Sequence, residues 1–273
     1  MPELPEVETV VRYLRPWLRG KTVRRFQTLN GWWKVVQGSS PETFAKHIVG
    51  QQIIKIRRRG KFVVWNLING NVLIHLRMTG RLITKLTEQD DPKHLTAEFQ
   101  FSDGTSLYFK DYRKFGRISF LENLADLDAR LGLEPLSSAF TATWLYRSLQ
   151  AHRRQIKPLL LDQTFIAGLG NIYVDESLWK AKIHPLAISQ HVGKRKATVL
   201  ATAIQTILKR AIELNGTTIQ SFKFGLGETG RFVSELQVFG RVGQPCPRCK
   251  TQICKIRVAQ RGTHFCPRCQ RLH

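Results

Sequence analysis

The first residues of the chain, Pro2 and Glu3, combine a potential nucleophile with a group that can move protons. Removal of Met1 leaves the secondary amine of Pro2 at the terminus, with the Glu3 carboxylate beside it. A free α-amino group has a pKa of roughly 7.7–8.0, so an appreciable fraction of it is neutral near pH 7. Such an amine attacks sugar or carbonyl carbons through a Schiff base, and Glu3 is placed to carry the protons that this chemistry requires.

The same residues also suit a purely structural role. Proline is favoured in the first turn of a helix, which accounts for Pro2 and Pro5. The carboxylates of Glu3, Glu6 and Glu8 suit the positive end of a helix dipole. The N-terminus alone favours this simpler interpretation, and the rest of the chain has to decide between the two.

Two pairs of cysteines near the C-terminus have the spacing of a zinc site. Cys246 and Cys249 form one Cys-x-x-Cys pair, and Cys266 and Cys269 form the other. In a four-cysteine zinc ribbon each pair supplies two thiolates to a tetrahedral ion, so the spacing predicts one structural zinc. A redox pair is the alternative, but it needs only one Cys-x-x-Cys and usually lies between a strand and a helix. Cys254 is out of register with both pairs and is expected to stay a free thiol.

The charge balance of the chain points to a polyanionic partner. The 273 residues leave room for two domains, and 43 Lys and Arg against 20 Asp and Glu give a net charge of +23. Nucleic acid is the first candidate, because basic residues recur at separated places along the chain. No stretch is as apolar and long as a membrane span, and the N-terminus lacks the features of a signal peptide. We therefore expect a soluble, intracellular protein, in which metal explains the cysteines better than disulfides do.

The pattern of residue types predicts an α+β protein that begins with a helix and continues into a sheet. Apolar residues at helical spacing from Val7 to Leu18 predict one amphipathic helix. From about residue 22 to 121 short β-rich runs alternate with turns such as Asn69-Gly70 and Asp103-Gly104. These turns join neighbouring strands, so the region is expected to form antiparallel sheet.

The second half of the chain reads mainly as helix. Residues 132–138 have the composition of a linker, and helical patterns then dominate to about residue 215. The longest pattern places the apolar residues from Val199 to Ile212 on one face, which is expected in the core, with a stop at Gly216. The glycine-rich stretch 224–230 is expected to be a loop whose composition allows disorder.

An N-terminal Pro-Glu, a β-rich first half, a helical second half and a basic zinc ribbon together resemble the formamidopyrimidine-DNA glycosylases. The resemblance runs from end to end. It is carried by Pro2-Glu3-Leu4-Pro5-Glu6-Val7-Glu8, Arg59-Gly60-Lys61, His75-Leu76-Arg77-Met78-Thr79-Gly80, Arg113-Lys114-Phe115-Gly116, Gly168-Leu169-Gly170-Asn171-Ile172-Tyr173 and Gln260-Arg261-Gly262-Thr263-His264-Phe265-Cys266. Leu4 in Pro-Glu-Leu-Pro-Glu resembles this branch of the superfamily. The endonuclease VIII branch typically has glycine at the same position.

The resemblance implies a fold and a division of the chain. It implies an N-terminal antiparallel β-sandwich with an opening helix in residues 1–131 and a linker in residues 132–138. A helical helix–two-turn–helix DNA-binding domain with a lesion-covering loop would follow in residues 139–236, and the zinc ribbon in residues 237–273. The chain departs from the family pattern at two places. Thr96 stands where the family often has a second histidine, two residues after His94. The linker begins Gly132-Leu133, where the family has Gly-Pro.

The resemblance also implies an activity. It makes the chain a DNA repair glycosylase and AP lyase that excises oxidised purines such as 8-oxoguanine and formamidopyrimidines. The Pro2 nitrogen would attack C1′ of the damaged nucleotide, Glu3 would act as acid and base, and β- and δ-elimination would then cut the strand. The implied partner is double-stranded DNA containing oxidised purines or abasic sites. We expect a monomer with one zinc ion and no membrane association, in the bacterial cytoplasm at the nucleoid.

Further site residues follow from the matching motifs. Lys61 and Arg261 complete the catalytic set, Lys61 contacting the DNA next to the lesion and Arg261 gripping a phosphate. Met78, Arg113 and Phe115 would fill the space that a flipped base leaves, as a glycosylase acting on duplex DNA requires. The remaining residues implied to bind DNA are His94, Lys157, Asn171 and Tyr173. Without the motifs, Met78 and Phe115 would be expected in the core and Asn171 as a helix N-cap.

Two other functions stay open at this point. The net charge and the four cysteines alone fit a nonenzymatic zinc-ribbon protein that binds nucleic acid, for which a free N-terminal proline would have no use. Within the enzymes, a glycosylase for oxidised pyrimidines in the manner of endonuclease VIII is the second candidate.

Overall fold

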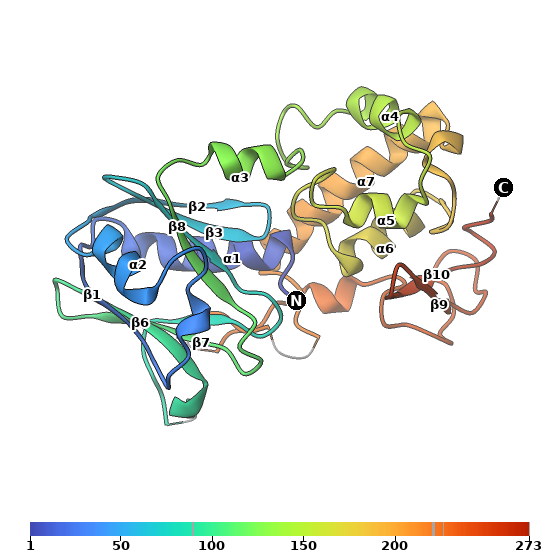
Figure 1. The fold of residues 1–273 in the computed structure, drawn as a ribbon. Helices are drawn as coiled ribbons and strands as arrows, with labels where there is room; N and C mark the ends of the chain where they lie inside the picture. Colours follow the sequence, from blue (N-terminus) through green and yellow to red (C-terminus); the bar gives the residue numbers. More distant parts are fainter. Residues whose placement is uncertain (89, 220–221, 226, 273) are drawn as a thin grey trace. The chain divides into compact units, whose positions relative to one another are not determined.

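The computed structural model describes residues 1–88, 90–219, 222–225 and 227–272 of the chain (Figure 1). The glycine-rich stretch 224–230, expected to be a loop that can be disordered, lies partly outside these residues. The chain forms two compact units. The first consists of residues 1–127 and 214–231, and the second of residues 128–213 and 232–273.

The first unit opens with the helix expected from the apolar spacing. Helix α1 (Leu4–Leu18) begins at Glu3, its N-cap residue, and carries Pro5 in its first turn. Its apolar face packs against strands β2 (Ile53–Arg59) and β3 (Phe62–Leu67). The prediction of one amphipathic helix at the N-terminus is therefore confirmed.

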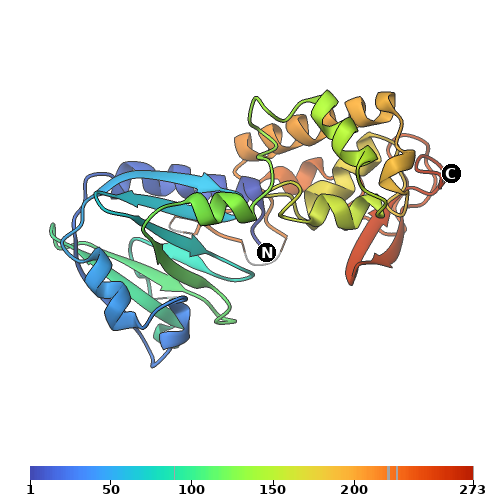
Figure 2. The same cartoon turned by 45° about the horizontal axis from the view of Figure 1, so that its top comes forward.

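Two antiparallel four-stranded sheets form the body of the first unit, and Figure 2 shows them as separate layers. One sheet has the order β1-β6-β7-β5 and consists of β1 (Val23–Thr28), β6 (Leu95–Phe101), β7 (Ser106–Lys110) and β5 (Arg81–Ile83). The other has the order β2-β3-β4-β8 and adds β4 (Asn71–His75) and β8 (Arg117–Leu121). Both sheets contribute to one apolar core, which includes Trp65, Phe99 and Phe109. This is the antiparallel β-sandwich that the resemblance implied.

Short elements complete the first unit. They are the 3₁₀ turns η1 (Trp33–Val35) and η2 (Pro92–His94) and the helix α2 (Pro41–Ile48). Helix α2 begins at Ser40, whose hydroxyl accepts a hydrogen bond from the Thr43 N–H, and it packs on β1. Helix α3 (Ala125–Arg130) follows β8 and spans the point, after residue 127, where the chain passes from the first unit to the second.

The second unit is mainly helical. Its helices are α4 (Ala142–Gln150), α5 (Ile156–Leu161), α6 (Asn171–Lys180) and α7 (Lys194–Glu213), with the 3₁₀ turns η3 (Ser189–His191) and η4 (Phe232–Glu235). A hairpin of β9 (Cys254–Val258) and β10 (Arg261–Phe265) lies between the two C-terminal Cys-x-x-Cys pairs, and β10 packs on α6. None of the described helices has the length and apolar composition that crossing a membrane requires.

Helix α7 differs in one respect from the expectation for its apolar face. Leu200, Ile204 and Leu208 are buried as expected, but Val199 is 43% exposed. Val199 lies at the edge of the apolar stripe, about 100° around the helix from Leu200, and no other element covers it fully. The expectation that Val199 belongs to the core was therefore wrong. The helix ends before Gly216, as predicted.

The expected linker, residues 132–138, is held by backbone hydrogen bonds at its start. Gly132 N–H donates to Gln163 O, and Leu133 O accepts from Ala167 N–H. These bonds fix the segment to the chain between α5 and α6. The boundaries of the expected domains at residues 131, 138 and 236 stay predictions.

Candidate catalytic and nucleic-acid-binding site

Pro2 and Glu3 lie at the start of α1, where the helix fixes their position. Both are buried, and Glu3 is 4% exposed, whereas Met1 is 43% exposed. Glu3 and Glu6 form a capping box, in which the Glu6 Oε2 atom accepts a hydrogen bond of 2.8 Å from Glu3 N–H. The structural interpretation of Glu3 is thus correct, and the capping box fixes the residue that directly follows Pro2.

Glu6 connects this terminus to a distant part of the first unit. Its Oε1 atom accepts a hydrogen bond of 2.7 Å from the Thr217 N–H, and the side chain is 2% exposed. The residues after Thr217 lead into the glycine-rich stretch. From the sequence, Glu6 was expected only to provide a favourable charge at the start of the helix. Its position in the Pro-Glu-Leu-Pro-Glu motif was the one signal of a further role.

Lys61 lies in the tight turn between β2 and β3, which requires the positive φ of 55° at Gly60. Its side chain is 6% exposed. The adjacent Phe62 pairs with His75 at the end of β4. Burial, together with the nearby charges of Arg77 and Lys61, lowers the pKa of His75 to about 3. His75 is therefore neutral near pH 7, and its Nδ1 atom accepts the Arg77 N–H at 3.0 Å.

Met78, Arg113 and Phe115 gather at one place, although they come from two different loops. The Arg113 guanidinium lies 4.7 Å from the centre of the Phe115 ring, and its Nη1 atom is 2.9 Å from the Met78 sulfur. Met78 is 40% and Phe115 46% exposed, so the expectation from residue type alone, that both lie in the core, was wrong. Arg113-Lys114-Phe115-Gly116 form a loop, because no strand or helix includes these residues.

Asp111 builds the loop that carries Arg113 and Phe115. Its Oδ1 atom accepts hydrogen bonds from the Arg113 N–H at 3.2 Å and from the Thr79 hydroxyl, and its Oδ2 atom accepts the Gly116 N–H at 2.6 Å. Thr79 follows Met78 directly, so one buried carboxylate holds both loops. Sequence reasoning missed Asp111. The available signal was an aspartate at the start of a loop, where it commonly accepts nearby backbone N–H groups.

His94 lies at the edge of the same region. Its ring is 4.3 Å from the ring of Tyr112, and its carbonyl accepts the Asp111 N–H at 2.8 Å. His94 is thereby joined to the loop of Arg113. The first unit thus positions six of the residues implied by the resemblance, and a seventh, His94, contacts their supporting loop.

Asn171 and Arg261 meet at the hairpin of the second unit. Asn171 is the first residue of α6, and Gly170 takes the N-cap position, so the interpretation of Asn171 as the N-cap was wrong. The Asn171 side chain instead donates a hydrogen bond of 2.9 Å to Gly262 O. Arg261, the residue before Gly262, is exposed at the start of β10. A helix start and an exposed arginine side by side suit the binding of an anion.

Lys157 is buried beneath this hairpin. Its Nζ atom lies 2.6 Å from Asp175 Oδ1, and neither side chain has any solvent exposure. The other oxygen of Asp175 accepts the His264 N–H at 2.8 Å, which joins α5, α6 and β10. Sequence reasoning missed Asp175 and His264. The implied contact of Lys157 with DNA stays a prediction.

Tyr173 is likewise fully buried. Its ring lies 5.9 Å from the ring of Phe232 in η4. Any contact with DNA at this position would come from the backbone at the start of α6. The implied DNA-binding role of Tyr173 therefore also stays a prediction.

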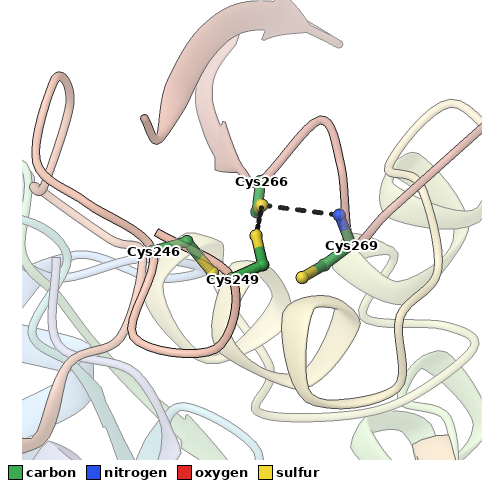
Figure 3. A group of neighbouring side chains, drawn as sticks. All are labelled: Cys246, Cys249, Cys266 and Cys269. Carbon is green, nitrogen blue, oxygen red and sulfur yellow. Dashed lines mark hydrogen bonds between the residues drawn. The ribbon is translucent and has the colours of Figure 1, made fainter. Parts of the chain in front are cut away.

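The four cysteines of the two Cys-x-x-Cys pairs form one cluster, shown in Figure 3. Their sulfur atoms all lie within 4.8 Å of one another, and Cys249 Sγ is 3.4 Å from Cys266 Sγ. Four sulfurs at about 2.3 Å from a tetrahedral zinc ion would be about 3.8 Å apart, so the cluster fits the ion. Cys254 does not belong to the cluster, as expected, and its sulfur lies 3.8 Å from Gln252 O.

The surroundings of the cluster are partly apolar. Cys246 and Cys266 pack with Val238, Ile253 and Trp179, and the Trp179 indole donates a hydrogen bond to Cys246 Sγ at 3.4 Å. Burial raises the pKa of Cys266 to about 12. Because thiolates are the ligands of zinc, binding of the ion releases the protons of such thiols. The second unit therefore combines a structural zinc site with an exposed arginine and a helix start.

Three family models match successive parts of the chain. The Formamidopyrimidine-DNA glycosylase N-terminal domain matches residues 1–118, and the Formamidopyrimidine-DNA glycosylase H2TH domain matches residues 131–223. The zinc finger found in FPG and IleRS matches residues 243–272. These matches agree with the zinc site found in the cysteine cluster.

Individual relatives are similar over their full length. The formamidopyrimidine-DNA glycosylase of Enterococcus faecalis is 41% identical, with 100% of this chain and 98% of the relative covered. That of Lactobacillus helveticus is 43% identical, with 99% of both chains covered.

Solved structures show the same fold. A structure of MutM in complex with carbocyclic 8-oxo-G containing DNA is 37% identical and has a TM-score of 0.90, covering 99% of this chain and 100% of the other. A Lactococcus lactis FPG mutant in complex with a Fapy-dG containing DNA has a TM-score of 0.91 at the same identity and coverage. The Lactococcus lactis Fpg has also been solved with an abasic site containing DNA; it is 36% identical, covers 98% of this chain and 99% of the other, and has a TM-score of 0.89.

Proposed function

The chain belongs to the formamidopyrimidine-DNA glycosylase family, and from this we propose that it excises oxidised purines from double-stranded DNA and then cleaves the strand as an AP lyase. The observation that carries the proposal is the buried Pro2-Glu3 terminus, fixed by the capping box at the start of α1. The substrates named for its structural relatives, 8-oxo-G, Fapy-dG and abasic DNA, define the expected lesion class.

The reaction begins with the release of Met1, which frees the Pro2 amine. The Pro2 nitrogen attacks C1′ of the damaged nucleotide, the base leaves, and a Schiff base with the ring-opened sugar results. Glu3 supplies and removes the protons that opening the sugar requires. β-Elimination and then δ-elimination release the 3′ and 5′ phosphates, which makes the enzyme a lyase as well as a glycosylase.

The loops of Met78, Arg113 and Phe115 occupy the space of the flipped nucleotide. The guanidinium donates hydrogen bonds to the base that has lost its partner, and the thioether and the ring replace the lost stacking. Their exposure in the first unit and their mutual contacts support this role. Asp111, which holds both loops, is a positioning residue.

Phosphate binding holds the DNA in register. Lys61 and His94 contribute from the first unit, and Asn171 and Arg261 from the second, with Lys157 and Tyr173 supporting the start of α6. The structural zinc holds the hairpin that presents Arg261, and it takes no part in the bond-breaking steps. We place this activity in the bacterial cytoplasm, at the nucleoid, and propose that the domains follow the boundaries inferred from the sequence.

Cleavage of duplex oligonucleotides that each carry one defined lesion tests the proposal. The expected result is strand cleavage at 8-oxoguanine and formamidopyrimidine, with phosphates left on both sides of the gap. Preferred cleavage at oxidised pyrimidines would identify an enzyme of the endonuclease VIII type. Binding without cleavage of any lesion, by protein whose N-terminal residue is shown to be Pro2, would identify a nonenzymatic binder.

A further inference from the structure

Trp33 is a large apolar side chain that the core of the first unit does not use. It is 60% exposed, whereas the following Val35 and Val36 are buried and the preceding Trp32 packs against the core. Packing within the sandwich therefore explains Trp32 and the two valines, but it does not explain Trp33.

The turn that carries Trp33 is fixed at both ends. Before Trp33, the Asn30 side chain donates hydrogen bonds to Pro92 O at 2.8 Å and to Leu95 O at 2.9 Å. After it, the Gln37 N–H donates to Ile118 O at 2.8 Å. The indole is thus presented by a backbone that is anchored to both sheets of the sandwich, so little further ordering is needed for a ligand to meet it.

Two lysines surround the tryptophan pair. Lys34 Nζ lies 5.6 Å from the centre of the Trp33 ring and 5.9 Å from that of Trp32, and Lys114 Nζ lies 5.3 Å from the Trp32 ring. Residues 29–37 contain no acidic residue. Within the described residues, the ion pairs involve neither Lys34 nor Lys114, so both charges are available to an anion.

The same surface adjoins the loop of Arg113 and Phe115. Lys114 lies between these two residues in the sequence and reaches back to the Trp32 ring. Tyr112, at the start of the loop, is 51% exposed, and its ring lies tilted against the His94 ring. Exposed rings and cations therefore alternate from the turn of Trp33 to the loop.

From these contacts we infer that Trp33, Lys34 and Lys114 form a binding site for an unpaired nucleotide of single-stranded DNA. The exposed indole stacks on the base, and the two ammonium groups neutralise the flanking phosphates. An unpaired nucleotide is the fitting ligand, because neighbouring bases cover both faces of a base inside a duplex. The site needs neither a lesion nor the Pro2 amine, so it is separate from the excision of the damaged base.

Tryptophan fluorescence tests this site in the full-length, zinc-loaded protein. Oligothymidylate is the probe, and the affinity and the quenching of fluorescence are measured for the wild type and for Trp33→Ala. Stacking is worth roughly 1–3 kcal/mol per base, so Trp33→Ala should weaken binding by about tenfold and remove part of the quenching. Trp33→Phe should keep most of the affinity, because a phenyl ring still stacks. Lys34→Gln should lower the slope of log K against log salt by about 0.7.

The matched control is Ile68→Ala, which removes another exposed apolar side chain of the first unit. Ile68 is 62% exposed and lies in the turn between β3 and β4. This turn is at the start of β4, whereas His75 is at its end. The control variant should bind oligothymidylate like the wild type. Equal affinity and quenching in Trp33→Ala and the wild type would overturn the inference. An equal loss of affinity for oligothymidylate and for undamaged duplex would also overturn it, since Trp33 would then be a general duplex contact.

Discussion

At the scale of single residues, one substitution can separate the capping role of Glu3 from the catalytic role proposed for it. Glu3→Gln removes the titratable group, but the amide oxygen can still accept the Glu6 N–H of the capping box. We expect base excision to slow by a factor of roughly 10²–10⁴, as for the loss of a general acid or base. Single-turnover excision of 8-oxoguanine measures the rate, and the melting temperature and the affinity for undamaged duplex should change little. A fall in melting temperature with unchanged excision would show that Glu3 is only a helix cap.

Lys157 is the second residue whose role the structure sharpens, because it forms a buried ion pair with Asp175. Lys157→Met leaves the carboxylate charged and without its cation, which typically costs about 3–5 kcal/mol of unfolding free energy. The double variant Lys157→Met with Asp175→Asn removes the buried charge and keeps an acceptor for the His264 N–H. It should therefore be more stable than the single variant. Urea unfolding at saturating zinc measures both.

The same pair of variants distinguishes positioning from DNA contact at Lys157. A positioning residue leaves the salt dependence of DNA binding unchanged once the stability is restored, whereas a phosphate contact contributes about 0.9 to its slope. Equal instability of the single and double variants would contradict the ion-pair account. A lower slope in the stable double variant would support the direct contact that the resemblance implied.

At the scale of elements, the zinc hairpin shares its apolar surroundings with helix α6. Cys246 accepts a hydrogen bond from the Trp179 indole, and the Gln270 side chain donates to Ile183 O after the end of α6. Removal of zinc should therefore loosen residues 243–272 and disturb Trp179, while both sheets of the first unit keep their protection. Hydrogen exchange before and after chelation measures the protection of both regions. Tryptophan fluorescence reports the disturbance of Trp179, with Trp179→Phe as its control. Full protection of residues 243–272 after confirmed metal loss would contradict the account.

Elements whose signals are local could be predicted from the sequence. The spacing of four cysteines predicted the metal cluster, and the Asn-Gly and Asp-Gly turns predicted antiparallel strands, because each signal depends on residues close together in the chain. Contacts between distant residues could not be predicted in this way. Glu6 meets the Thr217 backbone, and Asp175 meets His264, only because the folded chain brings them together. Nothing in the residue types alone identifies such partners.

The loops near Arg113 show the limit of residue type as a guide. Hydrophobicity alone predicted that Met78 and Phe115 would be buried, yet both are exposed, on two loops that are joined through hydrogen bonds to Asp111. The resemblance of the motifs pointed away from this expectation. Exposed apolar side chains of this kind depart from the usual pattern of burial, and such departures are expected at functional sites.

At the scale of the whole molecule, the net charge of +23 should dominate the affinity for DNA. Each neutralised phosphate contributes about −0.9 to the slope of log K against log salt in duplex binding. Arg261→Ala should weaken binding to any duplex and make that slope shallower by about one, because an exposed phosphate contact is lost. Fluorescence anisotropy at several salt concentrations measures the slope. An unchanged slope would show that Arg261 does not contact the backbone.

The central claim, that the Pro2 amine is the nucleophile, is tested most directly by borohydride trapping on duplex DNA containing 8-oxoguanine. Hydride reduces the Schiff base and links the protein covalently to the DNA, so protein that begins with Pro2 should form a stable adduct. Protein with additional residues ahead of Pro2 has an unreactive amide there and should form none, although its DNA affinity is kept. If the blocked protein still forms the reduced adduct, another amine, such as that of Lys61, is the nucleophile, and the account built on Pro2 is contradicted.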